Sequence, residues 1–246
     1  MKELFRVENV SKNGILDGVS FSMQEGELTA VMGPSGAGKS TLLYNVSGMD
    51  VPDGGQVWLC GTEITALSED GKAELRLRRT GFVFQQMNVI ARLGIMDNIL
   101  LPANHARKGK KARKENEARA MELMKLLGIE RLAGRGVSEV SGGELQRACI
   151  CRGMMMEPEL LFADEPTGAL NQSAAKDVMQ AFLRLNQKGT SILMVTHDSM
   201  VASCCDRILY LLDGKIKGEF ALGKWKEEEK KEREDRVREW LSGFEW

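Results

Sequence analysis

The chain has 246 residues, and its 34 Lys and Arg nearly balance its 35 Asp and Glu, giving a formal net charge of −1. This length suits one large α/β domain, with or without a helical insertion, and the whole-chain charge gives no indication of nucleic-acid or acidic-membrane binding. No apolar run approaches the ~18 residues that cross a bilayer, and charged residues interrupt the first ten positions, unlike a signal peptide. We therefore expect a cytoplasmic protein without a nucleic-acid partner.

Short apolar strands alternate along the chain with longer helical patterns, which predicts an α/β core with parallel strands. Two β-like runs joined by Asp213-Gly214 predict a hairpin near the end. In chain order, the predicted elements are a strand at 28–32, a helix at 40–47, strands at 56–60 and 81–84, a helix at 112–127, strands at 160–163 and 192–195, and the hairpin at 207–220.

Two charged stretches interrupt this pattern. Residues 107–114 contain six basic residues in eight, and a solvated linker with a helix start is favoured there over a membrane-surface or nucleic-acid patch. Residues 224–239 contain seven basic and seven acidic residues, which predicts an exposed helix. An apolar stripe at helical spacing is expected to pack on its own domain, with docking onto a partner as the alternative. The stripe consists of Val237, Trp240, Leu241 and Phe244.

The five cysteines do not predict a disulfide framework, because their number is odd and two of them are adjacent. Cys149 and Cys151 fall in a predicted helix, where a spacing of two points the side chains to different faces. A metal site shared by the two is therefore disfavoured, and we expect buried reduced thiols.

A glycine-rich segment that follows the strand at 28–32 matches the pattern G-x-x-x-x-G-K-[ST] in full. Glycines let the backbone fold tightly so that its N–H groups converge on phosphate oxygens, and the following helix adds the positive end of its dipole. Lys39 is expected to neutralise the β- and γ-phosphates of a nucleotide, and the Ser40 hydroxyl to ligate Mg²⁺. The predicted phosphate-binding residues are Gly33, Pro34, Ser35, Gly36, Ala37, Gly38, Lys39, Ser40 and Thr41.

A second apolar strand ends in two adjacent carboxylates, Asp164 and Glu165. Asp164 suits the Mg²⁺ shell, and Glu165 suits a residue that orients or deprotonates the water attacking the γ-phosphate. With the phosphate-binding loop, these carboxylates predict a Mg-ATP hydrolase.

The segment Val140–Arg147, which reads VSGGELQR, resembles the signature motif of ATP-binding-cassette (ABC) ATPases. A Ser-Gly-Gly turn at a helix start offers N–H donors and a hydroxyl to a phosphate. In that family the signature of one subunit caps the γ-phosphate held by the other, so the resemblance implies a head-to-tail dimer of two copies with two ATPs at the interface. The signature residues that it assigns to nucleotide binding are Ser141, Gly142, Gly143 and Glu144.

Two further residues fall in the order that the family shows. Gln85, after the strand at 81–84, looks like the glutamine that contacts Mg²⁺ or water and senses the transport partner. His197, after the strand at 192–195, looks like the switch histidine that contacts the γ-phosphate. The resemblance therefore implies Glu165, His197 and Gln85 as catalytic residues, and Ser40, Gln85 and Asp164 as Mg²⁺ ligands.

The resemblance covers residues 3 to 220 and implies a P-loop NTPase fold: an α/β ABC cassette with a RecA-like core, a small antiparallel β subdomain and a helical signature subdomain. We expect the ATPase domain at 1–222, with the helical subdomain at about 86–157, and a charged C-terminal helix at 223–246. A DNA-maintenance ATPase of the family would need a coiled-coil insertion, for which 39–141 leaves no room. A cell-division ATPase and the ATPase of a small-solute importer remain open alternatives.

The sequence around the motifs resembles one group in particular, the macrolide-export, lipoprotein-release and antimicrobial-peptide-resistance ATPases. The similar segments are Phe82–Gln86 and Ala163–Leu170. This implies an FtsX-like integral membrane permease as partner, and a location at the inner face of the membrane through it. Asn171, where most cassettes have aspartate, favours the bacitracin-type branch. Asn13 stands where relatives have an adenine-stacking aromatic residue, so that stack is not expected.

Overall fold

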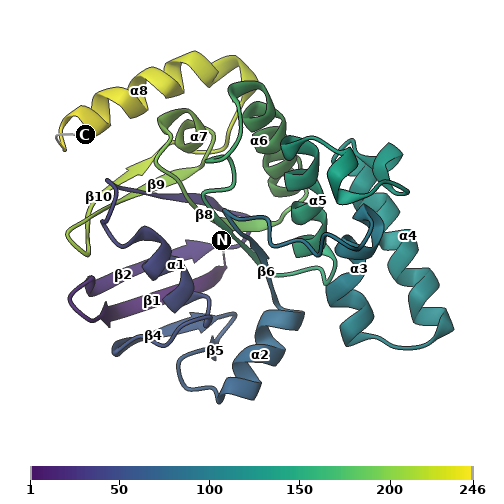
Figure 1. Ribbon diagram of the computed structural model, residues 1–246. Coiled ribbons are helices and arrows are strands. Elements are labelled where there is room, and N and C mark those ends of the chain that lie inside the picture. Colours follow the sequence, from purple (N-terminus) through teal and green to yellow (C-terminus); the bar gives the residue numbers. More distant parts are fainter. Residues whose placement is uncertain (1, 245–246) are drawn as a thin grey trace. The chain divides into compact units, whose positions relative to one another are not determined.

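The computed structural model describes residues 2–244 and divides the chain into two compact units (Figure 1). The first unit contains the residues up to Ala73 together with those from Ser191 onward, and the second contains Glu74–Thr190. The division falls inside helix α2 (Glu69–Arg78).

An antiparallel sheet in the first unit has the strand order β2-β1-β4-β5. A tight turn joins its two long strands, with positive φ at Asn13 (40°) and Gly14 (69°), a conformation that Asn and Gly tolerate best. The strands are β1 (Glu3–Lys12), β2 (Leu16–Gln24), β4 (Gly54–Leu59) and β5 (Thr62–Glu63).

The core of the first unit contains β3 (Leu28–Met32), which runs parallel to β8 (Ser191–Val195) on one side and to β9 (Arg207–Leu212) on the other. Every residue of β3 and β8 is buried, as expected for central parallel strands. Strand β10 (Lys215–Ala221) pairs antiparallel with β9 and completes the predicted hairpin. The short helices α1 (Lys39–Val46) and α7 (Ser199–Ser203) follow β3 and β8.

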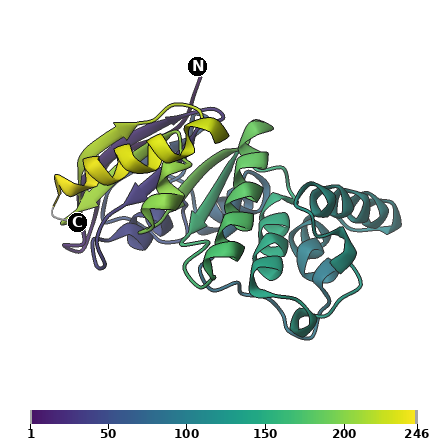
Figure 2. The ribbon, with the colours of Figure 1, turned by 90° about the horizontal axis from the view of Figure 1, so that it is seen from above.

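The C-terminal helix α8 (Lys230–Ser242), preceded by the 3₁₀ turn η3 (Glu227–Glu229), lies beside α7 and the β9–β10 hairpin (Figure 2). Its apolar stripe packs on its own unit, as predicted: Trp240 stacks on Phe220 with ring centroids 5.2 Å apart, and Phe244 stacks on Tyr210 at 4.4 Å. Arg233 is only 1% exposed and donates hydrogen bonds to backbone carbonyls, including those of Ser203 and Cys205.

The second unit contains one parallel strand pair, β6 (Thr80–Val83) and β7 (Leu160–Asp164). Helix α5 (Gly142–Met154) packs against β6 and against the other helices of this unit. Gly81 permits this approach, because a Cβ there would lie 2.3 Å from the Gly153 carbonyl oxygen. The remaining elements are α3 (Ile95–Ala106), α4 (Lys110–Leu126), η1 (Glu130–Leu132), η2 (Val137–Glu139) and α6 (Gln172–Gln187).

The elements predicted between residues 28 and 220 are confirmed, with ends that move by one or two residues, whereas the predicted C-terminal helix begins only at Lys230. The five cysteines are free thiols, and burial raises the pKa of Cys149 and Cys151. The boundaries 1–222 and 223–246 stay a prediction, and residues 245 and 246 lie outside the described part of the chain. Between residues 2 and 244, no helix has both the length and the apolar character of a membrane span.

Candidate functional site

The predicted phosphate loop connects β3 directly to α1. Gly36 and Gly38 have φ of 83° and 91°, a region that favours glycine, so these turns explain why the motif needs those residues. The Lys39 ammonium is buried and donates hydrogen bonds to the carbonyl oxygens of Gly33 and Pro34, each at 2.9 Å. The loop therefore encircles a cation directly after a buried strand.

The start of α1 is arranged for an external acceptor. Gly38 is the N-cap residue and, having no side chain, cannot cap the N–H groups of the first turn. These amides and the helix dipole point toward the loop, which is the geometry of an anion site at a helix N-terminus. The Ser40 and Thr41 side chains lie in that first turn, where a Mg-nucleotide would need them.

His197 lies at the same sheet edge as the phosphate loop. The register pairs Val31 of β3 with Val195 of β8, and the Thr196 N–H donates to the Val31 carbonyl at 3.1 Å. The strands are parallel, so the residues after each of them meet at one edge. The His197 side chain is exposed there, and Asp198 caps the following helix α7.

Gln85, Asp164 and Glu165 share an edge in the second unit. Val83 of β6 pairs with Ala163 of β7 in parallel, so the segments that follow the two strands start side by side. Asp164 is 2% exposed, whereas Gln85 is exposed. Glu165 has a positive φ of 44°, which is uncommon for a residue with a side chain and typical of strained functional positions.

The signature turn begins α5 with a capping box. The Ser141 N–H and hydroxyl donate to Glu144 Oε2 at 2.9 and 2.8 Å, and the Glu144 N–H donates to Ser141 Oγ at 3.4 Å. These hydrogen bonds, above all that from the Ser141 backbone, hold the pKa of the Glu144 carboxyl below its usual value. Arg131 pairs with the same carboxylate. The signature thus presents a hydroxyl and helix-start amides beside a fixed negative charge.

The glycines of the signature pack against the segment that follows Glu165. A Cβ on Gly142 would lie 3.3 Å from Leu170 Cδ2, and a Cβ on Gly143 would lie 2.8 Å from Ala174 Cβ. Asn171 caps α6, because its Oδ1 accepts the Ala174 N–H at 2.9 Å. The signature turn therefore packs directly against the segment that follows Asp164 and Glu165.

Two residues that the sequence analysis did not single out fix the loop after Gln85. Arg152 of α5 donates to the carbonyl oxygens of Met87 and Asn88 at 2.7 and 2.8 Å. Asn98 of α3 accepts from the Ile90 N–H at 2.8 Å and donates to the Ile90 carbonyl at 3.1 Å. Arg152 thus connects the loop after Gln85 to the signature helix and Asn98 connects it to α3, and no local sequence pattern marks either contact.

Ile15 was also missed. It is 44% exposed, and its Cγ2 would lie 2.9 Å from a Cβ placed on Gly38, so an apolar side chain lies against the phosphate loop. Asn13 lies at the tip of the same turn, where its N–H donates to Asp53. Asn13 is not aromatic, and the exposed Ile15 provides an apolar surface beside the loop.

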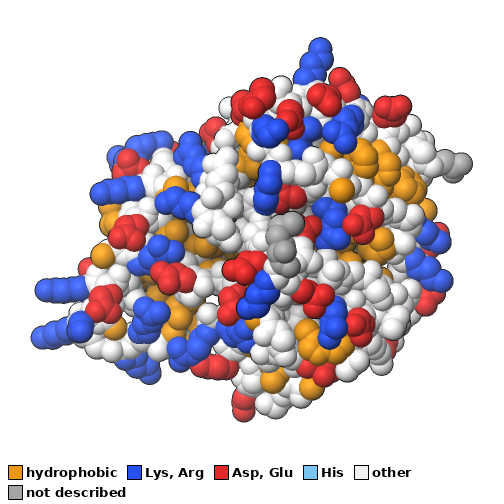
Figure 3. Space-filling model, turned by 180° about the vertical axis from the view of Figure 1, so that it is seen from behind, with side chains coloured by type: hydrophobic (Ala, Val, Ile, Leu, Met, Phe, Trp, Pro, Cys, Tyr) orange, Lys and Arg blue, Asp and Glu red, His pale blue; other side chains and the backbone are white. Residues whose placement is uncertain are grey.

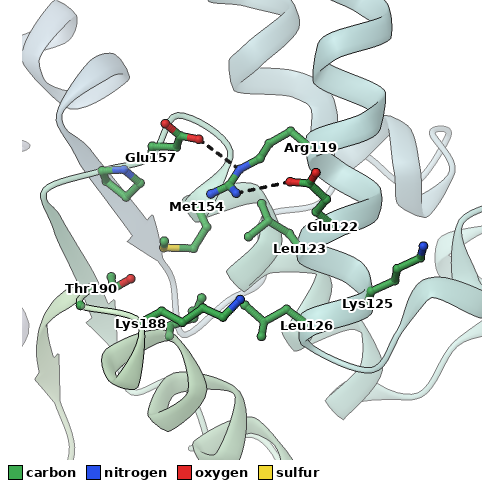
Figure 4. A pocket seen from close by; sticks show the side chains of 12 residues that line it. Arg119, Glu122, Leu123, Lys125, Leu126, Met154, Glu157, Lys188 and Thr190 are labelled. Carbon is green, nitrogen blue, oxygen red and sulfur yellow. Dashed lines mark ion pairs between the residues drawn. The ribbon is translucent and has the colours of Figure 1, made fainter.

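A cavity of about 780 Å³ opens elsewhere in the second unit, and none of the predicted site residues lines it (Figure 4). Arg119 points across it and pairs with Glu157 at 3.5 Å and with Glu122 at 3.8 Å. Its walls come from α4, from the end of α5 and from the segment around Lys188 and Thr190. Its two central carboxylates already have a cationic partner, so this cavity shows no prepared ligand site.

The residues predicted to hold Mg-ATP fit it chemically. Lys39 would supply the cation for phosphate, and a hydroxyl, a carboxylate and an amide from Ser40, Asp164 and Gln85 would offer the oxygen ligands that Mg²⁺ prefers. In the described residues no group of three or more His, Cys, Asp or Glu side chains could hold a metal by itself. In nucleotide sites Mg²⁺ takes few protein ligands and completes its shell with phosphates and water.

Loop, strand-end carboxylates and signature turn together define a P-loop ATPase cassette. The ABC transporter family model matches residues 16–168, more than half of the chain. The chain belongs to that family. It is an ATP-binding and ATP-hydrolysing subunit of the ABC type.

Several curated relatives are ATPases of export or release systems. The lipoprotein-releasing system ATP-binding protein LolD of Aquifex aeolicus is 43% identical over 224 residues, which cover 89% of this chain and 99% of the relative. The bacitracin export ATP-binding protein BceA of Halalkalibacterium halodurans is 38% identical over 208 residues, which cover 84% and 81%. The macrolide export ATP-binding/permease protein MacB of Chlorobaculum tepidum is 38% identical over 201 residues, which cover 82% of this chain and 30% of the relative.

Solved structures agree with this assignment. The dimeric structure of MJ0796, described as a bacterial ABC transporter cassette, has a TM-score of 0.81 at 35% identity, covering 90% of this chain and 100% of that one. A dimeric post-hydrolysis state of the same cassette, bound to ADP and Pi, has a TM-score of 0.81 at 34% identity, with the same coverage. The predicted fold class, an α/β cassette with antiparallel sheet and helical subdomain, is confirmed.

Proposed function

We propose that Lys39, Ser40, Asp164, Gln85, Glu165 and His197 act on one Mg-ATP. Lys39 and the first-turn amides of α1 hold the phosphates, and Glu165 orients the attacking water and accepts its proton. His197 stabilises charge that develops on the γ-phosphate. Mg²⁺, when bound through Ser40, Gln85 and Asp164, neutralises the β- and γ-phosphate oxygens. The observation that carries this proposal is the phosphate loop with Lys39 enclosed by its carbonyls.

The signature turn acts on the nucleotide of a second copy in this proposal. Ser141 and the amides of Gly142 and Gly143 approach the γ-phosphate held by the other chain's phosphate loop. Because the glycines carry no side chains, the turn packs closely against Leu170 and Ala174, which keeps it rigid. Dimeric cassettes among the solved relatives support a dimer of two copies.

Ile15 supplies the surface for the nucleobase. Its exposed side chain touches the phosphate loop at Gly38, so a base extending from the bound phosphates would meet an aliphatic rather than an aromatic face. An aliphatic surface gives apolar contact without ring stacking, and discrimination between ATP and GTP should therefore be weak.

Residues 87–101 carry closure of the dimer to the permease. Arg152 and Asn98 connect this loop to α5 and α3, so a shift of the signature helix moves the loop with it. Ile90 is 48% exposed in this loop and offers an apolar contact to a permease helix. We assign the chain to an FtsX-like mechanotransmitting permease at the inner face of the membrane, with antimicrobial-peptide resistance favoured by the similarity to BceA and by Asn171.

Replacing Glu165 with Gln tests the hydrolytic assignment. Glu165→Gln should bind ATP, form a stable ATP-dependent dimer and lose turnover by about a hundredfold or more. Hydrolysis close to that of the unchanged chain would remove Glu165 from this role. Membranes of the native host extracted with ATP and Mg²⁺ should yield this variant with a permease that has a large extracytoplasmic domain. A channel-type permease would instead overturn the choice of branch.

A further inference from the structure

A tip of the second unit, formed by the end of α3 and the start of α4, carries a dense positive charge. Every basic side chain of this tip is exposed. Lys and Arg side chains gather at the left of Figure 3, the side on which α4 lies in that view. The residues of this basic tip are Arg107, Lys108, Lys110, Lys111, Arg113 and Lys114.

The basic tip accounts for the net positive charge of the second unit. The second unit contains 19 Lys and Arg against 13 Asp and Glu, whereas the first contains 15 against 22. The excess of six positive charges in the second unit equals the six charges of the tip. The net charge of −1 therefore conceals a localised cation patch, of the kind that attracts anionic surfaces.

The basic residues of the tip lie at a helix N-terminus, where the helix dipole disfavours positive charge. Helix α4 begins at Lys110 with Gly109 as N-cap, no capping side chain and no acidic residue in its first turn. Cations near a helix N-terminus oppose the helix dipole. Helix α2 shows the ordinary arrangement, with Glu69 and Asp70 in its first turn. The basic residues of α4 therefore do not serve to stabilise the helix that carries them.

Neighbouring carboxylates neutralise only part of the charge. Lys111 lies 4.0 Å from Glu115 and Arg113 lies 3.0 Å from Glu117, in exposed pairs that contribute little. Arg107, Lys108, Lys110 and Lys114 pair with no acidic side chain in the part of the chain that the structure describes. Four cations thus remain for an external anion.

We propose that the basic tip binds the anionic lipid headgroups of the membrane that holds the permease. The proposal rests on the function proposed above, which brings the chain to a membrane surface. Clusters of four to eight Lys and Arg beside a membrane are attracted by its negative surface potential. Residues 107–114 contain no aromatic side chain on which a base could stack, so single-stranded nucleic acid is the less suitable partner.

Co-sedimentation of the purified chain with vesicles tests the proposal. Vesicles of phosphatidylcholine alone are compared with vesicles of equal parts phosphatidylcholine and phosphatidylglycerol, at low and at high salt. The chain should bind the anionic vesicles, lose this binding at high salt and ignore the neutral ones. The double variant Lys110→Glu/Lys111→Glu should bind at least about tenfold more weakly.

A matched control exists on α8, which also starts with two lysines, Lys230 and Lys231. Lys230→Glu/Lys231→Glu changes the charge equally but lies in the balanced segment, so it should bind anionic vesicles as the unchanged chain does. Carboxylates at the start of α4 favour the helix dipole, so the tip variant should melt no lower than the unchanged chain.

Vesicle binding that is weakened equally by both double variants would overturn the proposal. Binding to neutral vesicles would also overturn it, and so would tight binding of an oligonucleotide by a chain that does not bind vesicles. ATP hydrolysis is measured in the same samples without lipid, and both variants should keep it. Absence of hydrolysis in the unchanged chain would contradict the proposed function and leave the vesicle result standing.

Discussion

The phosphate loop and the signature turn are two glycine- and serine-rich helix starts whose N-termini are capped differently. Gly38 leaves the start of α1 without a capping side chain, and Lys39 lies within the loop. Ser141 caps α5 and is itself bound by the Glu144 carboxylate. The first turn is therefore ready for phosphate within its own chain. The second is closed by a carboxylate, which a phosphate from a second copy would have to displace or approach in the proposed dimer.

The largest effect is expected from removing the cation of the phosphate loop. Lys39→Ala deletes the buried ammonium and should reduce ATP hydrolysis by a hundredfold or more, on the order of other lost charge-stabilising donors. Turnover and binding of a fluorescent ATP analogue check this. Lys215→Ala is the control, because that lysine makes a surface pair with Asp17 and should leave turnover unchanged. Retained ATP binding in Lys39→Ala would show that the loop does not depend on its cation.

A smaller but clear effect is expected from filling the packed face of the signature. Gly143→Ala places a methyl group 2.8 Å from Ala174 Cβ and should destabilise the protein by about 1–3 kcal/mol. Thermal unfolding measures the loss, and Ala174→Gly in the same chain should restore it by making room. Gly134→Ala, where a Cβ meets nothing within 4 Å, should change stability by less than about 0.5 kcal/mol. A Gly143→Ala protein as stable as the unchanged chain would contradict the packing described here.

Glu144→Gln sharpens the comparison by removing the charge that closes the signature turn. The amide oxygen still accepts from Ser141, but the negative charge that would face the γ-phosphate of a second copy is gone. In chains that also carry Glu165→Gln, the ATP-dependent dimer should form about two- to tenfold more tightly when Glu144→Gln is added. Sedimentation measures the dimer dissociation constant. Glu139→Gln is the control, since Glu139 likewise accepts a backbone N–H three residues before it, that of Gly136, outside the site. Weaker dimerisation of Glu144→Gln alone would mean that the charge assists the approach.

The same residue predicts a pH dependence of stability. Because hydrogen bonds lower the pKa of Glu144 in the folded chain, ionisation of this group stabilises the fold above its ordinary value of 4.5, and this contribution is lost as the pH falls through the lowered pKa. The melting-temperature difference between the unchanged chain and Glu144→Gln should therefore be constant near neutral pH and shrink in acid. A difference that grows in acid would contradict the assignment.

The smallest effect is expected at Asn171. Asn and Asp cap helices about equally well, and a carboxylate adds a favourable interaction with the dipole of α6. Asn171→Asp should therefore raise stability by no more than about 1 kcal/mol, measured by thermal unfolding. A marked loss of stability would show that the amide has a role beyond accepting the Ala174 N–H.

Local patterns allowed the phosphate loop, the strand-end carboxylates and the signature turn to be predicted, because each occupies a few consecutive residues next to a strand or helix. Ile15, Arg152 and Asn98 escaped prediction because their roles depend on what folding brings to them. Arg233 is the clearest case. The balanced charge of its segment predicts exposure, but the side chain is buried among carbonyl groups whose hydrogen bonds replace those of water.

The most direct test of the account mixes two defective chains in the Glu165→Gln background, one with Lys39→Ala and the other with Ser141→Ala. Each alone should fail to dimerise with ATP. Their mixture should form a heterodimer, because the intact phosphate loop of one chain meets the intact signature of the other. Formation of that heterodimer, measured with differently tagged chains, would support a signature that acts across two copies. Its absence, with each chain folded, would contradict the claim that the two helix starts complete one site from two chains.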